Sequence, residues 1–308
     1  MSTEPEPSIW TILSVLRWTT SYFVSRGIDS PRTTAELLLT RALYLDKIDL
    51  YLRFDQPLQP AELSTFRALI KRRIAGEPTA YILGTKSFWN QDLIVTPDVL
   101  IPRPETEHLV EAARRYLQST GDGRDRAVLD LGTGTGAVVL ALAAEVSRHR
   151  FFATDRSLRA LAIARTNARR NHIDADVHFI CGHWFQALGS DRPIFDLVVS
   201  NPPYIPSGEI ENLPPEIRQH EPRNALDGGP DGLSAVREIL SQAPFHLRAG
   251  GSLMLEIGAG QHRTVQSIIR QVGKYGCPEF VKDYSGHKRV LQVTVADAPG
   301  HGCGFNAN

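Results

Sequence analysis

The segment AVLDLGTGTG, residues 127–136, constrains the fold of this 308-residue chain more than any other. An apolar run of the kind that forms a buried strand ends at Asp130, and glycines follow at positions 132, 134 and 136. Glycines permit a tight turn from strand to helix and let the backbone approach a ligand closely. Beyond this segment, strand and helix patterns alternate. This alternation predicts an α/β fold, with a parallel sheet covered by helices on both faces.

The individual elements of this part follow from the spacing of apolar residues. Strands are predicted at 127–131, 151–154, 177–180, 197–200 and 253–257, and helices are predicted to begin near residues 136, 157, 232 and 260. Two later strand-like segments, 280–283 and 290–295, come close together in the chain and predict an antiparallel end of the sheet.

The first part of the chain has a helical pattern, with apolar residues mainly three and four positions apart. Helices are predicted over 9–26, from Pro31 through Ala42, and over 60–74. Ser30 and Pro31 suit the cap and first turn of the second helix. These short helices predict a small bundle, and Gly76-Glu77-Pro78 interrupts the pattern.

A β-hairpin is predicted around Asn90-Gln91-Asp92, between apolar residues on either side. Prolines then favour an extended stretch before a helix at 105–117. The resulting division is a helical N-terminal domain at 1–76, a hairpin and linker at 77–104, an α/β domain at 105–297 and a disordered tail at 298–308.

Composition narrows the class of protein. Lys plus Arg and Asp plus Glu both number 34, so a formal net charge of zero argues against binding nucleic acid through its phosphates. The three cysteines lie far apart without a CxxC pair, and the histidines are scattered, so we expect no metal site and a reducing compartment. The N-terminus is acidic and no apolar run reaches the roughly 18 residues that span a bilayer. We expect a cytoplasmic monomer.

The glycine loop is the candidate cofactor site. The loop is Gly132-Thr133-Gly134-Thr135-Gly136, and Asp155 stands nineteen residues beyond it, at the end of the next strand. A carboxylate there can accept both hydroxyl protons of a ribose. NAD and a bare structural turn are the alternatives, but the spacing is GxGxG rather than the dinucleotide GxGxxG. Together these residues resemble the AdoMet-binding signature of Rossmann-like methyltransferases. Trp184, after the third strand, either flanks the adenine or is simply a half-buried core aromatic.

The candidate chemical site is Asn201-Pro202-Pro203-Tyr204, which follows the apolar strand 197–200. Prolines cannot donate to a β-ladder, so the strand must stop and its last carbonyls stay free. The side-chain oxygen of Asn201 and the carbonyl of Pro202 can each accept one hydrogen of a planar NH2 group, and Tyr204 can pack against its plane. An ordinary Asn-Pro-Pro turn is the structural alternative.

Such an arrangement suits methylation of an amide nitrogen. Its lone pair is delocalised into the carbonyl, so the nitrogen must be held in line with the electrophile, and two acceptors stabilise the positive charge as it forms. The methylated nitrogen becomes acidic and can lose its proton afterwards, so no strong base is required.

The chain as a whole resembles the HemK/PrmC family of peptide chain release factor glutamine methyltransferases over roughly residues 10 to 295. The matching segments are GEPTAYILG at 76–84, FW at 88–89, LIPRPETE at 100–107, DLGTGTG at 130–136, DRS at 155–157, WF at 184–185, VSNPPYI at 199–205, HEPR at 220–223, ALDGG at 225–229, DGL at 231–233 and LEIG at 255–258. Of these, IPRPETE is the most specific.

The resemblance implies a seven-stranded, Rossmann-like, AdoMet-dependent methyltransferase domain preceded by a helical domain that helps grip the release factor. The reaction would fall on N5 of the glutamine in that factor's Gly-Gly-Gln loop. Gly132 to Gly136 and Asp155 would then bind AdoMet, Trp184 would lie beside the adenine, and Asn201 to Tyr204 would hold the substrate amide, with Asn201 also near AdoMet.

The effect of one departure from the family pattern and the choice among substrates are not decided by the sequence. His183 replaces the Asp that usually precedes the Trp. It can accept a hydrogen bond only as one neutral tautomer, so we expect a weaker or pH-dependent AdoMet affinity. The same chemistry on a ribosomal protein, or adenine N6-methylation of nucleic acid, also fits an NPPY clamp. The segment from Ile205 to Gly232 is either a lid or a surface excursion.

Overall fold

The computed structural model describes residues 9–119, 123–173, 176–189 and 193–296. The predicted disordered tail at 298–308 therefore lies outside the described residues. The chain divides into two compact units, one of Met1–Gly84 with Pro215–His220, and the other of Thr85–Pro214 with Glu221–Asn308. No helix in the described ranges is long and apolar enough to cross a membrane.

The first unit is helical. Its helices are α1 (Ile12–Ser25), α2 (Pro31–Leu43), α3 (Lys47–Leu52), α4 (Pro60–Ile74), α5 (Thr79–Leu83) and α9 (Pro215–His220). The three predicted helices are confirmed as α1, α2 and α4, with Pro31 and Pro60 in the first turn of α2 and α4. Ser30 is the N-cap residue of α2, but its side chain makes no capping hydrogen bond. The apolar faces of α1 to α5 bury one core, to which Phe23, Leu38 and Phe66 belong.

The second unit is built on a seven-stranded sheet of order β5-β4-β3-β6-β7-β9-β8. Its strands are β3 (Ala127–Leu131), β4 (Arg150–Asp155), β5 (Val177–Cys181), β6 (Phe195–Ser200), β7 (Leu247–Glu256), β8 (Glu279–Lys282) and β9 (Lys288–Thr294). β5, β4, β3, β6 and β7 are parallel, and β9 pairs antiparallel with both β7 and β8. All seven predicted strands and the predicted antiparallel end are confirmed.

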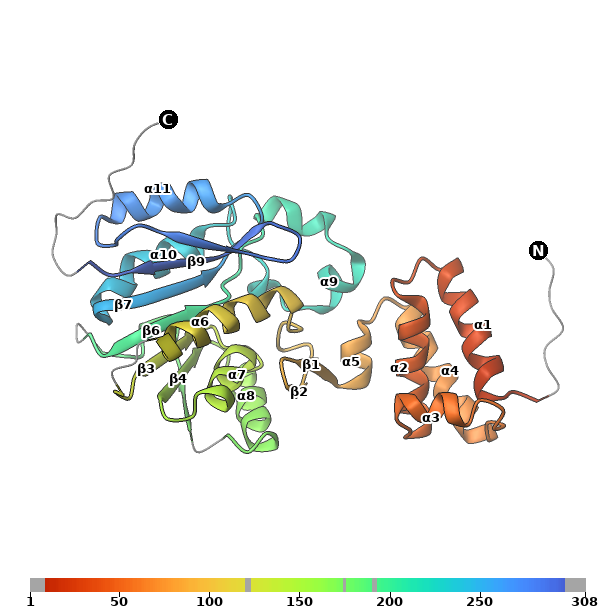
Figure 1. Cartoon of the computed structure of the whole chain (residues 1–308). Coiled ribbons are helices and arrows are strands. Elements are labelled where there is room, and N and C mark those ends of the chain that lie inside the picture. The colour runs from red at the N-terminus through yellow and green to blue at the C-terminus, as the bar shows by residue number, and fades with distance from the viewer. Residues whose placement is uncertain (1–8, 120–122, 174–175, 190–192, 297–308) are drawn as a thin grey trace. The chain divides into compact units, whose positions relative to one another are not determined.

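Helices cover both faces of this sheet, as Figure 1 shows. The helices are α6 (Glu107–Ser119), α7 (Ala137–Glu145), α8 (Leu158–Arg170), α10 (Ser234–Gln242) and α11 (His262–Val272). Successive strand residues face opposite layers, so Val128 packs with α6, α7 and α8 while Leu129 packs with α10 and α11. The strands read as continuous apolar runs because both faces are buried.

Short elements complete this unit. They are the hairpin strands β1 (Thr85–Phe88) and β2 (Gln91–Ile94), and the 3-10 turns η1 (Pro104–Thr106), η2 (Ser207–Asn212), η3 (Arg223–Ala225) and η4 (Ala243–Phe245). The hairpin is confirmed, but its turn lies at Trp89 and Asn90, since Phe88 pairs with Gln91. Trp89 adopts a left-handed φ of 53° there. The helix predicted at 105–117 begins two residues later, at Glu107, after η1.

Candidate active site

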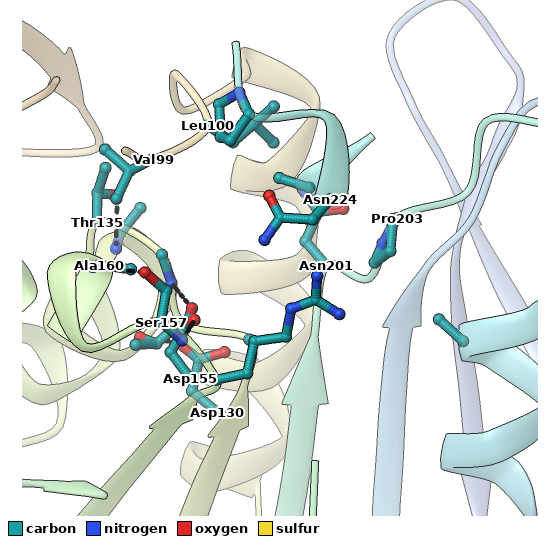
Figure 2. Close-up of a pocket in the computed structure, with 18 of the residues that line it drawn as sticks. Val99, Leu100, Asp130, Thr135, Asp155, Ser157, Ala160, Asn201, Pro203 and Asn224 are labelled. Carbon is teal, nitrogen blue, oxygen red and sulfur yellow. Dashed lines mark hydrogen bonds between the residues drawn. The ribbon is translucent and has the colours of Figure 1, made fainter. Parts of the chain in front are cut away.

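A cavity of about 620 Å³ opens at the carboxyl ends of β3, β4, β5 and β6. This is the edge of an open parallel sheet at which ligands bind. Of the predicted site residues, the lining includes Gly132, Thr133, Gly134, Thr135, Asp155, Trp184, Asn201 and Pro203. Figure 2 shows Asp130, Asp155 and Thr135 on one side of this pocket and Asn201, Pro203 and Asn224 on the other. The structure thus joins the two candidate sites in one cavity.

The glycine loop adopts a backbone that only glycine tolerates well. Gly132, Gly134 and Gly136 have φ values of 69°, 56° and 85°. The loop is held to the next strand, because the N–H of Thr133 donates to the carbonyl of Thr154 over 2.9 Å. Gly136 does not line the cavity; a Cβ there would lie 3.0 Å from Leu140 Cδ1, so its role is close packing of α7.

Asp155 joins this loop to the start of the next helix. One carboxylate oxygen accepts the N–H of Gly134 over 2.9 Å, and the other accepts the N–H of Ser157 over 2.8 Å. A carboxylate offers about four acceptor sites, so about two remain for a ligand's hydroxyl groups. Asp155 therefore both shapes the loop and presents acceptors to the cavity that it lines.

Asp130 is a second carboxylate in the lining, and it is almost fully buried, with 2% of its surface exposed. The hydroxyl of Thr133 donates to it over 2.7 Å. Burial raises the pKa of Asp130 to about 7, and the nearby charge of Asp155 acts in the same direction. Two carboxylates in one cavity favour a ligand that carries positive charge.

Trp184 is both a core aromatic and a cavity residue. It has a left-handed φ of 46°, and a Cβ on Gly132 would lie 3.2 Å from its ring, so the indole packs closely over that glycine. It is half-buried against the α10–α11 layer and also lines the cavity.

Next to Trp184, His183 Nδ1 lies 3.5 Å from Glu238 Oε1, and both residues line the cavity. Sequence reasoning missed Glu238, since nothing in its local pattern distinguishes it from a surface helix residue.

The NPPY segment is fixed by side chains from three other segments. Asn201 Nδ2 donates to the hydroxyl of Thr106 over 3.0 Å, and the hydroxyl of Tyr204 donates to Glu256 over 3.2 Å. Gln261 donates to the carbonyl of Tyr204 over 2.9 Å. Pro202 is buried, and neither Pro202 nor Tyr204 belongs to the cavity lining. Burial raises the pKa of the Tyr204 phenol above its usual range, so Tyr204 stays a hydrogen-bond donor.

The IPRPETE segment forms one wall of the cavity. Arg103 and Thr106 both line it, and Arg103 forms an ion pair with the buried carboxylate of Glu221. Glu221 also accepts the N–H of Ile101 over 3.2 Å. The segments IPRPETE and HEPR, which carry the family resemblance, are therefore joined to each other at the cavity wall. No individual role for Arg103, Thr106 or Glu221 had been predicted.

These residues fit S-adenosylmethionine. Its sulfonium and amino groups are cationic, which matches the two carboxylates, and a Cβ on Gly134 would meet no atom within 4 Å, so the loop leaves space at the cavity. The volume lies within the roughly 300–1,000 Å³ of small-molecule sites. Fold and site together define the class of protein: a Rossmann-like, AdoMet-dependent methyltransferase.

Comparison with known proteins gives the particular family. Residues 14–84 match the PrmC N-terminal domain and residues 105–213 match the methyltransferase small domain. A "Release factor glutamine methyltransferase" of Geobacter sulfurreducens is 45% identical over 286 residues, which cover 93% of this chain and 97% of that protein. Proteins of the same name from Rhodopirellula baltica (37% identical, 93% and 97% covered) and Gloeobacter violaceus (43%, 90% and 94%) also match. The chain belongs to the release factor glutamine methyltransferase family.

Solved structures support the fold. The hMettl16 catalytic domain superposes with a TM-score of 0.54 at 16% sequence identity, covering 68% of this chain and 77% of that one. At this identity the likeness concerns the methyltransferase fold alone.

Proposed function

We propose that this protein transfers a methyl group from S-adenosylmethionine to the side-chain amide nitrogen, N5, of the glutamine in the Gly-Gly-Gln motif of class 1 peptide chain release factors. The observation that carries the proposal is that one cavity is lined by both the glycine loop, with Asp155, and the clamp residues Asn201 and Pro203. The name shared by the relatives, release factor glutamine methyltransferase, supports the choice of substrate.

In this proposal, each part of the cavity has one task. S-adenosylmethionine, when bound, supplies an electrophilic methyl group. Gly132, Thr133, Gly134, Thr135, Asp155 and Trp184 bind it, Gly136 packs α7 against the loop outside the cavity, and Asn201 lies at the edge of the cosubstrate. Asn201 Oδ1 and the carbonyl of Pro202 accept the two amide hydrogens, with Pro203 and Tyr204 completing the clamp. These acceptors stabilise the charge that forms on nitrogen, which then gives up one proton to water.

The partner is a protein of translation termination, so we place the reaction in the cytoplasm. We assign substrate recognition to the N-terminal domain at 1–76, before the hairpin and linker at 77–104 and the catalytic domain at 105–297. We also propose that the enzyme acts as a monomer and binds no nucleic acid directly.

The test is transfer of labelled methyl from S-adenosylmethionine to a purified class 1 release factor. The matched substrate is the same factor with Gly-Gly-Gln changed to Gly-Gly-Ala, beside a ribosomal protein mixture and adenine-containing DNA. We expect label on the native factor alone. Label on the ribosomal proteins or on DNA would keep the fold and the cosubstrate and would overturn the proposed partner. Absence of label everywhere would contradict the proposed function.

A second prediction concerns the pH dependence of cosubstrate binding. Asp130 is mostly neutral below its pKa of about 7 and mostly ionised above it. A cationic ligand prefers the ionised form, so the affinity for S-adenosylmethionine should rise by up to about tenfold from pH 6 to pH 8. Calorimetry at several pH values would measure this affinity. Asp130→Asn should remove its pH dependence. If Asp130→Asn keeps the pH dependence and His183→Asp removes it, the dependence comes from His183 and not from Asp130.

A further inference from the structure

We infer that Glu256 is a positioning residue for methyl transfer: through the hydroxyl of Thr106 it determines which end of the Asn201 amide faces the substrate. The inference rests on the proposed clamp role of Asn201. It concerns a side chain outside the cavity, which neither the glycine loop nor the NPPY segment contains.

Glu256 is the last residue of β7, and its side chain is fully buried, with 0% of its surface exposed. It does not belong to the cavity lining, whereas Thr106, which is 4% exposed, does. The hydroxyl of Thr106 donates to Glu256 Oε2 over 2.7 Å. Thr106 therefore connects a buried carboxylate to the cavity surface.

The direction of these hydrogen bonds follows from counting hydrogens. A threonine hydroxyl has one hydrogen, and here that hydrogen forms the hydrogen bond to the ionised carboxylate of Glu256. Toward Asn201, the same oxygen can only accept, so the amide group 3.0 Å away must present its NH2 end. Asn201 Oδ1 is thereby turned away from Thr106 and left free to accept a hydrogen from the substrate amide. Without this constraint, the two ends of an asparagine amide have nearly the same shape and either can face the substrate.

The same carboxylate holds the other end of the clamp. The phenol of Tyr204 donates to Glu256 Oε1 over 3.2 Å, so the two oxygens serve two different residues. One buried acceptor thus fixes both the Asn201 amide and the Tyr204 ring. A group that only filled space at this position would do neither.

The charge state of Glu256 decides whether this arrangement holds. Besides the two hydroxyls, the charged groups that face it are Arg289 on β9, which favours the ionised form, and Glu105 in η1, which disfavours it. Burial is the largest effect and raises the pKa of Glu256 to about 6. Once protonated, Glu256 can donate to Thr106. The Thr106 hydroxyl then points at Asn201, and the amide turns its NH2 toward the substrate NH2.

The experiment is single-turnover methyl transfer to the release factor between pH 5 and pH 8, with both substrates saturating. For the wild type, the rate constant should fall as the pH drops through about 6. In Glu256→Gln, we expect a loss of about 10- to 100-fold near pH 8 and no such fall at low pH. The KM for the release factor should change little. Because the same factor is used throughout, an effect of pH on the substrate would appear in both enzymes.

Two substitutions of Thr106 test the connection without altering the buried carboxyl. Thr106→Ser keeps the hydroxyl and should stay within a few-fold of the wild type, while Thr106→Val should lose rate as Glu256→Gln does. Tyr275→Phe is the control for loss of a buried hydrogen bond, since its hydroxyl donates to the carbonyl of Leu240 over 2.7 Å. It should leave the rate and its pH profile unchanged.

Two outcomes would overturn the inference. One is a wild-type rate and pH profile in Glu256→Gln, and the other is a wild-type rate in Thr106→Val. If Glu256→Gln does not fold, the Thr106 pair decides alone. Failure of the proposed function is distinguishable, because then the wild-type enzyme itself would transfer no methyl group to the release factor.

Discussion

Replacing Asn201 by alanine is expected to lower the rate constant for methyl transfer by about 100- to 1,000-fold, the range found when one preorganised transition-state hydrogen bond is removed. The amide oxygen is one of the two proposed acceptors for the substrate NH2, and its orientation is fixed by the hydrogen bond of 3.0 Å to Thr106. Single-turnover transfer to the release factor, with both substrates saturating, measures the loss directly. Binding of the release factor, measured separately, should fall far less.

A matched control is Asn171→Ala. Asn171 is the C-cap residue of α8. Like Asn201, it has one side-chain hydrogen bond to the described residues, here to the carbonyl of Asn167 over 2.9 Å. It does not line the cavity, so its loss should affect stability slightly and the rate not at all. A wild-type rate in Asn201→Ala would show that the amide clamp is wrong, and the role inferred for Glu256 would fall with it.

The regular part of the fold was predictable because it depends on local periodicity. Each strand of the parallel sheet is buried on both faces, so it stands out as an apolar run between glycine and polar turns. The GxGxG loop needs no tertiary information either, since Gly132, Gly134 and Gly136 all occupy left-handed backbone.

Short elements and the hairpin turn were missed or misplaced. α3 and α5 have only six and five residues, too few for a spacing of three and four to be recognised. The hairpin turn was expected at Asn90-Gln91-Asp92, because asparagine and aspartate favour turns. The left-handed turn residue is Trp89 instead, whose ring nitrogen donates to Glu145 over 2.9 Å. This hydrogen bond between residues distant in sequence can override the local preference of asparagine and aspartate for the turn.

The supporting residues of the candidate site depend on such long-range contacts. Thr106 lies 95 positions from Asn201 and 150 positions from Glu256, and no local pattern announces that the three are joined. Both Thr106 and Glu256 belong to segments that carry the family resemblance, IPRPETE and LEIG. The resemblance marked these segments as characteristic of the family, but only the folded sheet shows what the two side chains contact.

The sequence left open whether the segment from Ile205 to Gly232 is a lid or a surface excursion. In the structure, its two ends are hydrogen-bonded to each other next to NPPY. The N–H of Gly228 donates to the carbonyl of Ile205 over 2.8 Å, and the hydroxyl of Ser207 donates to Asp227 over 2.6 Å. Residues of the ALDGG motif are therefore held against the backbone that immediately follows NPPY.

Gly232→Ala should consequently damage catalysis from a position outside the cavity. A Cβ at Gly232 would lie 2.3 Å from the carbonyl oxygen of Tyr204 and 2.8 Å from Gln261 Nε2, the side chain that holds that carbonyl. The backbone of Tyr204 must move, and a displacement of about 1 Å at a reacting group can lower the rate by about 100-fold. We expect that loss in single-turnover methyl transfer, with the affinity for S-adenosylmethionine close to that of the wild type.

Gly260→Ala is the matched control, because it separates backbone strain from displacement of the clamp. Gly232 and Gly260 both have positive φ, 75° and 85°, so alanine carries a similar conformational penalty of about 1–2 kcal/mol at either position. At Gly260, however, no atom lies within 4 Å of the added Cβ. Both variants should therefore unfold at lower temperature than the wild type, and Gly232→Ala alone should lose activity below its melting transition. Equal rates in the two variants would mean that the proposed clamp tolerates movement of Tyr204. Its geometry would then depend on Asn201 and Pro202 and not on the packing of Gly232 against Tyr204.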